Sequence, residues 1–148
     1  VTTEPRALAS DGGAGLAMLI EVDFDSAVTL SGDATVTGGA TVSSQALING
    51  NTTLQINLAG VADQTCYDID LSTAVNGVTG VVTCSVATLN GDTNDDQLVS
   101  SLDRAQLKAG SGDPASANPR VDVNSDGTVT SLDRALGKAK SGNSVTCP

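Results

Sequence analysis

The stretch Asp92–Asp103, DTNDDQLVSSLD, returns thirty residues later as Asp122–Asp133, DVNSDGTVTSLD. Both copies place oxygen-bearing side chains at the first, third, fifth, ninth and twelfth positions of a twelve-residue loop. In a calcium loop, such side chains and one backbone carbonyl surround the cation at about 2.3–2.6 Å. The expected ligands are Asp92, Asn94, Asp96, Leu98 (carbonyl), Ser100 and Asp103 in the first loop, and Asp122, Asn124, Asp126, Thr128 (carbonyl), Thr130 and Asp133 in the second. The sequence therefore predicts two bound Ca²⁺ ions.

Both loops depart from the usual helix-loop-helix calcium motif. The closing residue is Asp rather than Glu, so the helix that follows must lie closer to the ion. At the sixth position, where a positive φ is favoured, the second loop has Gly127 but the first has Gln97. We therefore expect the second loop to be the tighter site. The alternative for both loops is an Asp- and Asn-rich turn whose side chains bond only the local backbone.

The similarity between the copies extends past the loops. Asp92–Gly112 and Asp122–Gly142 are identical at 13 of 21 positions. Each loop is followed by Ser-Leu-Asp-Arg-Ala and then Lys-Ala, which predicts a short helix with basic residues four apart on one face. This duplicated loop-helix segment, about Leu89 to Gly142, resembles a dockerin. Dockerins attach extracellular bacterial proteins to a β-sandwich receptor called a cohesin.

The resemblance also implies which residues contact a receptor. In dockerins these are the end of the loop and the face of the helix that follows. The corresponding residues are Ser101, Leu102, Arg104 and Lys108, or Ser131, Leu132, Arg134 and Lys138. Both copies have Ser-Leu where many dockerins have Ser-Thr. Leu102 and Leu132 are candidates for the module core as well as for docking, and either copy, or both, could dock.

Composition excludes several classes of function. With 7 Lys and Arg against 17 Asp and Glu, the net charge of −10 argues against nucleic acids and anionic membranes. The absence of His excludes imidazole acid–base chemistry, His-ligated metals and Ser-His or Cys-His nucleophile pairs. With no Trp, one Tyr and one Phe, the chain lacks the aromatic residues of a sugar-stacking platform. We expect a protein that is not an enzyme.

Residues 16–89 show the alternation of half-buried β-strands. Apolar and acidic residues alternate over Ile20–Asp25, and apolar and amide residues alternate over Leu54–Leu58. Asn49-Gly50, between two apolar runs, predicts a two-residue hairpin turn. The pattern predicts an all-β sandwich of six or seven strands, of immunoglobulin or cohesin type, at residues 16–89. It would lie between an N-terminal arm at 1–15 and a small all-α calcium module at 90–148.

The calcium module is small and its expected core is sparse. That core comprises Val99, Leu102, Leu107, Val129, Leu132 and Leu136. Domains of this size usually need a disulfide or a metal to fold, so we expect bound calcium to supply much of the folding free energy.

Three cysteines are present: Cys66, Cys84 and Cys147. If a loop centred on Val75 joins adjacent strands, Cys66 and Cys84 face each other and form a disulfide in an oxidising exterior. Cys147 is then left for a bond between molecules, while the competing arrangement joins Cys84 to Cys147. Because the chain starts at Val1, we expect the mature product of a secretory precursor, located outside the cell or on its surface.

Two functions are compatible with these features. In the first, the calcium module of one copy docks onto the sandwich of the next, and head-to-tail contacts give an extracellular filament or matrix. A spare cysteine favours this reading. The charges favour it too: Val1–Leu89 has a net charge of −8 (nine acids, one base) and Asn90–Pro148 has −2 (eight acids, six bases). Two bound Ca²⁺ ions would bring the second value to about +2, so the two parts would attract each other. In the alternative, the chain is the C-terminal anchoring fragment of a larger secreted protein bound to a separate cohesin-like receptor. The sequence alone favours self-assembly.

Overall fold

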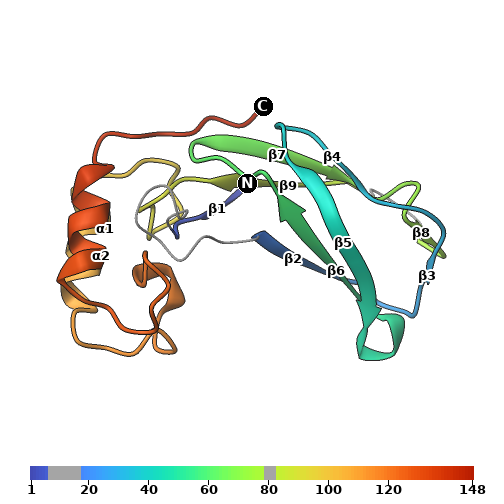
Figure 1. Cartoon of the computed structure of the whole chain (residues 1–148), viewed down its shortest axis with the longest axis horizontal. Coiled ribbons are helices and arrows are strands. Elements are labelled where there is room, and N and C mark those ends of the chain that lie inside the picture. The colour runs from blue at the N-terminus through green and yellow to red at the C-terminus, as the bar shows by residue number, and fades with distance from the viewer. Residues whose placement is uncertain (7–17, 79–82) are drawn as a thin grey trace. The chain divides into compact units, whose positions relative to one another are not determined.

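The computed structural model describes residues 1–6, 18–78 and 83–148. The chain divides into two compact units (Figure 1). The repeat unit comprises Val1–Leu16, Ala62–Cys66 and Val86–Pro148, and the sandwich unit comprises Ala17–Val61 and Tyr67–Ser85. The repeat unit therefore recruits residues from well outside the two repeats. The greater part of the expected N-terminal arm and residues 79–82 of the expected sandwich lie outside the described residues.

The strands of the described residues form three sheets. They are β1 (Thr2–Glu4), β2 (Met18–Asp23), β3 (Thr29–Leu30), β4 (Thr35–Val36), β5 (Thr41–Ile48), β6 (Thr53–Ala59), β7 (Thr65–Asp70), β8 (Val75–Asn76) and β9 (Thr83–Thr88). The strand orders are β1-β9-β7-β4, β2-β6-β5 and β3-β8. The predicted fold class, β-sheets followed by two short helices, is confirmed. Strands β2 to β9 number eight rather than six or seven, because three of them have two residues and leave no alternation in the sequence.

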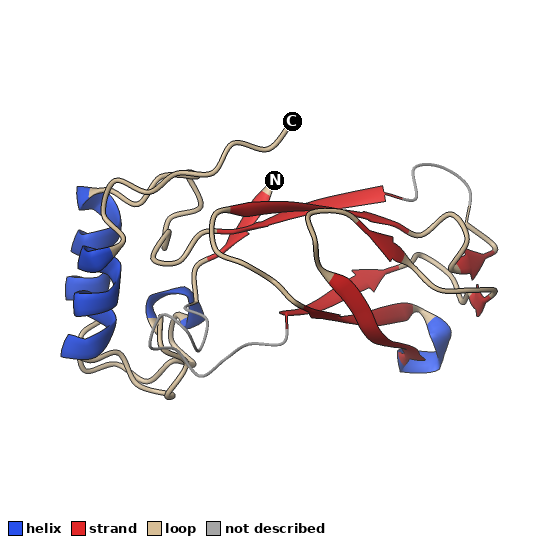
Figure 2. Cartoon of the chain, turned by 45° about the horizontal axis from the view of Figure 1, so that its top comes forward, coloured by secondary structure: helices blue, strands red, loops and turns tan. Residues whose placement is uncertain are grey.

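The sandwich unit buries the alternating residues that the sequence indicated. In the antiparallel pair of β2 and β6, Ile20 lies opposite Ile56, and Ile56 is fully buried. Glu21, the neighbour of Ile20, is exposed. Strands β5, β6 and β2 form one layer of this unit (Figure 2). Apolar aliphatic side chains and the buried Tyr67 fill the core, as expected from a chain with so few aromatic residues.

The turn between β5 and β6 is longer than predicted. Ile48 pairs with Thr53, so four residues connect the strands. Asn49, Gly50 and Asn51 all have positive φ, at 51°, 68° and 69°. The Asn49 side chain donates to Thr53 Oγ1 at 3.1 Å, which stabilises this wider left-handed turn in place of the expected two-residue hairpin.

Each repeat supplies one helix, α1 (Ser101–Ala109) and α2 (Ser131–Ala139). Between them, Leu107, Val121, Val123 and Val129 form a buried cluster against which Leu136 packs. Val99 instead joins a second cluster with Ala87, Leu89 and Val145. Leu102 and Leu132 are 61% and 49% exposed, so they do not belong to the core. The reason is that both lie at the start of a helix, on the face turned away from these clusters.

Gly137 makes room for a core residue of the other helix. It occupies the position in α2 that Leu107 occupies in α1. A Cβ added at Gly137 would collide with Leu107 Cδ1, and Leu107 is fully buried. The two repeats are thus complementary at this point, with a large residue facing a residue that has no side chain.

We expect Gly137→Ala to lower the free energy of unfolding by up to about 2 kcal/mol. Overpacking costs about 1–3 kcal/mol, and the higher helix propensity of Ala returns only about 1 kcal/mol. Urea unfolding in saturating calcium measures the change. Lys138→Ala, at the exposed next residue of the same helix, is the matched control. Stabilisation by Gly137→Ala would contradict the steric argument.

The disulfide joins Cys66 to Cys147, and Cys84 is free. Both predicted pairings of Cys84 are therefore wrong. The physical reason is that Cys66 is bonded to the C-terminal tail, while on the neighbouring strand Ser85 Oγ donates to Asp68 Oδ1 at 2.5 Å. Cys66 and Cys147 instead pack together against the cluster of Ala87, Leu89, Val99 and Val145.

Non-reducing peptide mapping is expected to give a Cys66–Cys147 peptide and one unmodified thiol, Cys84. Burial raises the pKa of the Cys84 thiol, with a smaller contribution from the negative charge of Asp68. A raised pKa means less thiolate at neutral pH, so alkylation of the folded chain should be slower than that of the chain in denaturant. Rapid labelling of the native protein, or a peptide that contains Cys84 in a disulfide, would contradict this assignment.

Candidate metal centre and docking face

The first loop is organised around Asp92, which is fully buried. Its Oδ1 accepts the backbone N–H groups of Asp95 at 2.8 Å and Asp96 at 3.2 Å. Its Oδ2 accepts the N–H of Gln97 at 3.0 Å. Gln97 has a φ of 66°, so the chain makes the sharp turn here without glycine.

The second loop repeats this arrangement around Asp122. Asp122 Oδ1 accepts the N–H of Asp126 at 3.2 Å, and its Oδ2 accepts the N–H of Gly127 at 2.9 Å. Gly127 has a φ of 94°. The two loops therefore share one backbone path, although the sequence suggested a difference at the sixth position.

The twelfth residue of each loop connects the loop to its helix. Asp103 Oδ1 accepts the N–H of Thr93 at 2.8 Å, and its Oδ2 accepts the N–H of Ser100 at 2.7 Å. In the second loop, Asp133 Oδ1 accepts the N–H of Asn124 at 3.0 Å and Asp133 Oδ2 accepts the N–H of Thr130 at 2.7 Å. The bond from Asn124 corresponds to a longer one in the first loop, from the Asn94 N–H to Asp103 Oδ1 at 3.3 Å. Ser100 and Thr130 are N-caps, and each forms a capping box with its Asp. The short Asp side chain thus reaches both the start of its loop and the first turn of its helix.

The two repeats pair reciprocally through their backbones. Leu98 of the first loop forms a β-bridge with Ser144, and Thr128 of the second forms one with Pro114. The Val99 N–H donates to Asn143 O at 2.9 Å, and the Val129 N–H donates to Asp113 O at 3.0 Å. Each loop is thereby held by the segment that follows the helix of the other repeat. In each repeat, the N–H of the valine at the eighth loop position, Val99 or Val129, therefore needs a carbonyl of the other repeat as its acceptor.

The residues of both loops fit a hard cation by their chemistry. Asp92, Asp103, Asp122 and Asp133 are at most 4% exposed. No ion pair between these four and a basic side chain is found in the described part of the chain. Buried carboxylates in such a setting require compensation of their charge, which a divalent cation supplies. Within the described ranges, however, no three acidic or cysteine side chains already converge at metal-binding distance, so the fit lies in the donor set and its order along the loop.

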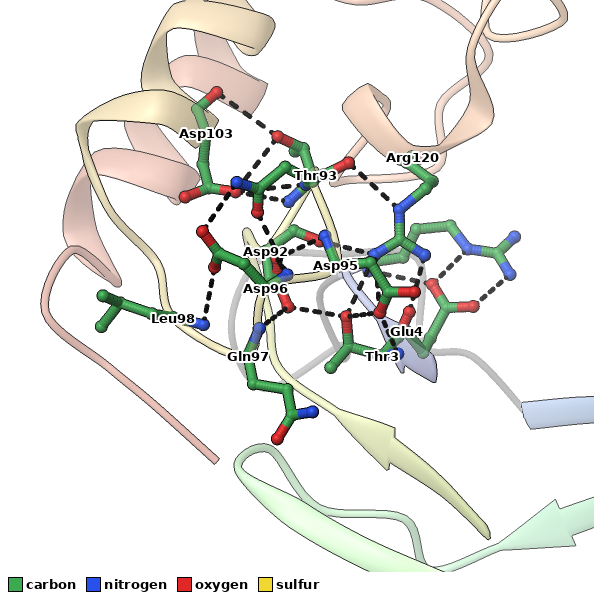
Figure 3. A network of polar contacts seen from close by, with 12 residues as sticks. Thr3, Glu4, Asp92, Thr93, Asp95, Asp96, Gln97, Leu98, Asp103 and Arg120 are labelled. Atoms are coloured by element: carbon green, nitrogen blue, oxygen red, sulfur yellow. Dashed lines mark hydrogen bonds and ion pairs between the residues drawn. The ribbon is translucent and has the colours of Figure 1, made fainter. Parts of the chain in front are cut away.

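Two residues that the sequence did not single out, Thr3 and Arg120, contact the first loop, in part through its fourth residue, Asp95 (Figure 3). Thr3 of β1 donates its hydroxyl to Asp92 Oδ2 at 2.7 Å. Its N–H donates to Asp95 Oδ1 at 2.6 Å, and Arg120 Nη2 lies 3.6 Å from the same oxygen. The only signal in the sequence is a break in the repeat, because Asp95 and Arg120 correspond to Ser125 and Asn90 in the other copy.

The eight expected receptor-binding residues are all exposed on the two helices. Leu102 and Leu132 have the largest exposed apolar side chains of α1 and α2. Each is the second residue of its helix and is followed by a basic residue two positions later, Arg104 or Arg134. The repeat unit therefore presents two similar faces, each an apolar residue bordered by positive charge.

Comparison with known protein families decides what this segment is. Residues 90–140 match the family model described as dockerin type I domain. The duplicated segment is a dockerin type I domain. In the dockerin the two loops carry the buried Asp residues, and the two helices carry the exposed leucines.

No curated protein matches the chain. Among solved structures, the chain is similar to a C-terminal interface mutant of a type II cohesin–X-dockerin complex from Acetivibrio cellulolyticus. That match has 14% identity and a TM-score of 0.38, and it covers 97% of this chain and 94% of that chain. No described helix is both long and apolar enough to span a lipid bilayer.

Proposed function

We propose that this chain is a non-catalytic extracellular anchoring protein whose calcium-loaded dockerin docks onto a cohesin-type receptor. The observation that carries the proposal is the coincidence of a dockerin match at residues 90–140 with two exposed, leucine-led helix faces that directly follow the loops. A cohesin is the receptor that the dockerin resemblance implies. The Cys66–Cys147 disulfide supports an oxidising, extracellular location.

In this proposal each loop holds one Ca²⁺ ion. The ligands are the six residues predicted for each loop, from Asp92 to Asp103 and from Asp122 to Asp133. The ion would compensate the buried carboxylates and fix the start of the helix that Asp103 or Asp133 caps. Calcium would thus hold Leu102 and Leu132 in the positions from which they contact a receptor.

Anchoring to a separate receptor has more support than self-assembly. The self-assembly hypothesis relied on an unpaired Cys147 for bonds between molecules, but Cys147 is bonded to Cys66. The remaining thiol, Cys84, is only partly exposed. The N-terminal residues Thr2–Glu4 pair with β9 of the same chain, so this strand is not free to join a neighbour. The charge contrast between Val1–Leu89 and Asn90–Pro148 still favours contact between copies, but it does not identify a receptor site on the sandwich.

The test is binding of the full chain to a purified type I cohesin in saturating calcium, measured by calorimetry. If either helix face can dock, Leu102→Ala and Leu132→Ala should each leave affinity within about 3-fold of wild type. The double variant should lose about 30-fold or more, since truncation of an interface anchor costs about 2 kcal/mol or more and either face has then lost its leucine. Leu19→Ala, at an exposed leucine of β2, is the matched control.

Each outcome has a distinct meaning. A complete loss in one single variant would assign docking to that face alone. Unchanged binding of the double variant would overturn the proposed interface. Sedimentation of the chain without a cohesin tests the other hypothesis, because calcium-dependent polymers would overturn anchoring to a separate receptor in favour of self-assembly.

A further inference from the structure

The first loop is connected to the N-terminal strand β1, more than eighty residues away in the sequence. The residue of β1 that contacts the loop is Thr3, which is only 2% exposed. Its hydroxyl lies 2.7 Å from Asp92 Oδ2 and 2.8 Å from Asp95 Oδ1. Both acceptors belong to the loop, and Asp92 is its first expected ligand (Figure 3).

Arg120 forms hydrogen bonds with both β1 and the first loop. Its Nη1 donates to Thr3 O at 2.8 Å, and its Nη2 donates to Thr3 Oγ1 at 3.0 Å. The same guanidinium donates to two carbonyls of the loop, Asp92 O at 2.8 Å and Thr93 O at 3.1 Å. One side chain therefore binds the strand and the loop together.

Among the described residues, no hydrogen bond joins β1 or a basic side chain to the second loop, whose carboxylates accept bonds from their own loop instead. The position of Asp95 is taken by Ser125, whose buried Oγ has no hydrogen-bond partner in the described structure. The position of Arg120 is taken by Asn90. The added contacts thus belong to the loop that turns at Gln97, while the second loop turns at Gly127. A positive φ costs more free energy for Gln than for Gly.

We propose that β1 is a structural part of the first calcium site, with Thr3 and Arg120 as positioning residues that orient Asp92 and Asp95. Calcium in the first loop and the pairing of β1 with β9 then stabilise each other, since coupling between two binding events is reciprocal. The inference rests on the proposed binding of calcium by the loops. Hydrogen-bond partners of metal ligands typically change metal affinity about 10–100-fold, which is the expected size of the effect.

The first test is a calcium titration of the full chain, followed by NMR at the amides of Gln97 and Gly127, one in each loop. Thr3→Val should weaken binding at the first loop by about 10-fold or more and leave the second loop unchanged. Thr3→Ser keeps the hydroxyl and should restore affinity. Thr2→Val makes the same substitution type at the exposed preceding residue of β1 and should have no effect.

The second test measures the reciprocal effect with a matched pair of ligand variants, Asp96→Ala and Asp126→Ala. In excess calcium, Asp96→Ala should increase hydrogen exchange at the Thr3 amide, which donates to Asp95. Asp126→Ala, at the same position of the other loop, should leave this amide protected. A merely general loss of stability would increase exchange in both variants.

The outcomes separate this inference from the proposed function. If the wild-type chain binds calcium at neither loop, the proposed function fails and the inference fails with it. If the wild type binds two ions but Thr3→Val binds both as tightly, or weakens both equally, only the inference is overturned. Equal protection of Thr3 in the two ligand variants overturns the reciprocal coupling.

Discussion

Removal of calcium with an excess of chelator is expected to unfold α1 and α2 and to leave the sandwich unit folded. Each loop buries two carboxylates, Asp92 and Asp103 or Asp122 and Asp133, and their mutual repulsion returns when the cation leaves. A ligand at 1,000 times its dissociation constant stabilises a fold by about 4 kcal/mol, so two ions contribute about 8 kcal/mol. A repeat unit with two small apolar clusters does not retain its helices after a loss of that size.

Far-UV circular dichroism measures the helix signal as calcium is withdrawn and returned. Hydrogen exchange at β2, β5 and β6 provides the internal control, since these strands should remain protected. Because each loop is bonded to the segment after the other helix, as in Val99 to Asn143, both helices should unfold together. A helix signal that persists in excess chelator would contradict the prediction, and so would a loss of protection throughout β2, β5 and β6.

The features that the sequence predicted well are those with a local signature. The helix that follows each loop and the alternation in β2 and β6 both depend on neighbours within a few residues. The exposure of Leu102 and Leu132 required the structure, because an apolar residue at the start of a helix suits either a core or a docking face.

What the sequence did not predict depends on contacts between distant segments. Thr3 meets Asp92, and Cys66 meets Cys147, only because β1 and Ala62–Cys66 belong to the repeat unit. No periodicity marks these contacts. The differences between the two copies were the available clue, since Asp95 and Arg120 break the repeat at the positions where the first loop has a neighbour.

Loss of the Cys66–Cys147 disulfide is the second large effect that we expect. The bond closes a loop with a sequence separation of 81, and the entropy of such a loop corresponds to roughly 4–5 kcal/mol. It holds the C-terminal tail against the cluster that contains Val99 and Val145. Lys140 also contacts the Ala62–Cys66 segment, because its Nζ lies 3.0 Å from Asp63 Oδ2. A partly exposed ion pair of this kind contributes at most about 1 kcal/mol.

The comparison is between Cys66→Ser with Cys147→Ser and the control Cys84→Ser, each unfolded by urea in saturating calcium. The double variant should lose roughly 4–5 kcal/mol, while the control removes a thiol without opening the loop. Since calcium and the disulfide stabilise the same unit by different routes, the double variant should stay folded with calcium and need a higher calcium concentration to fold. Equal stability of the two proteins would show that the tail is held without the bond, by the backbone pairing of Leu98 with Ser144 and the packing of Val145.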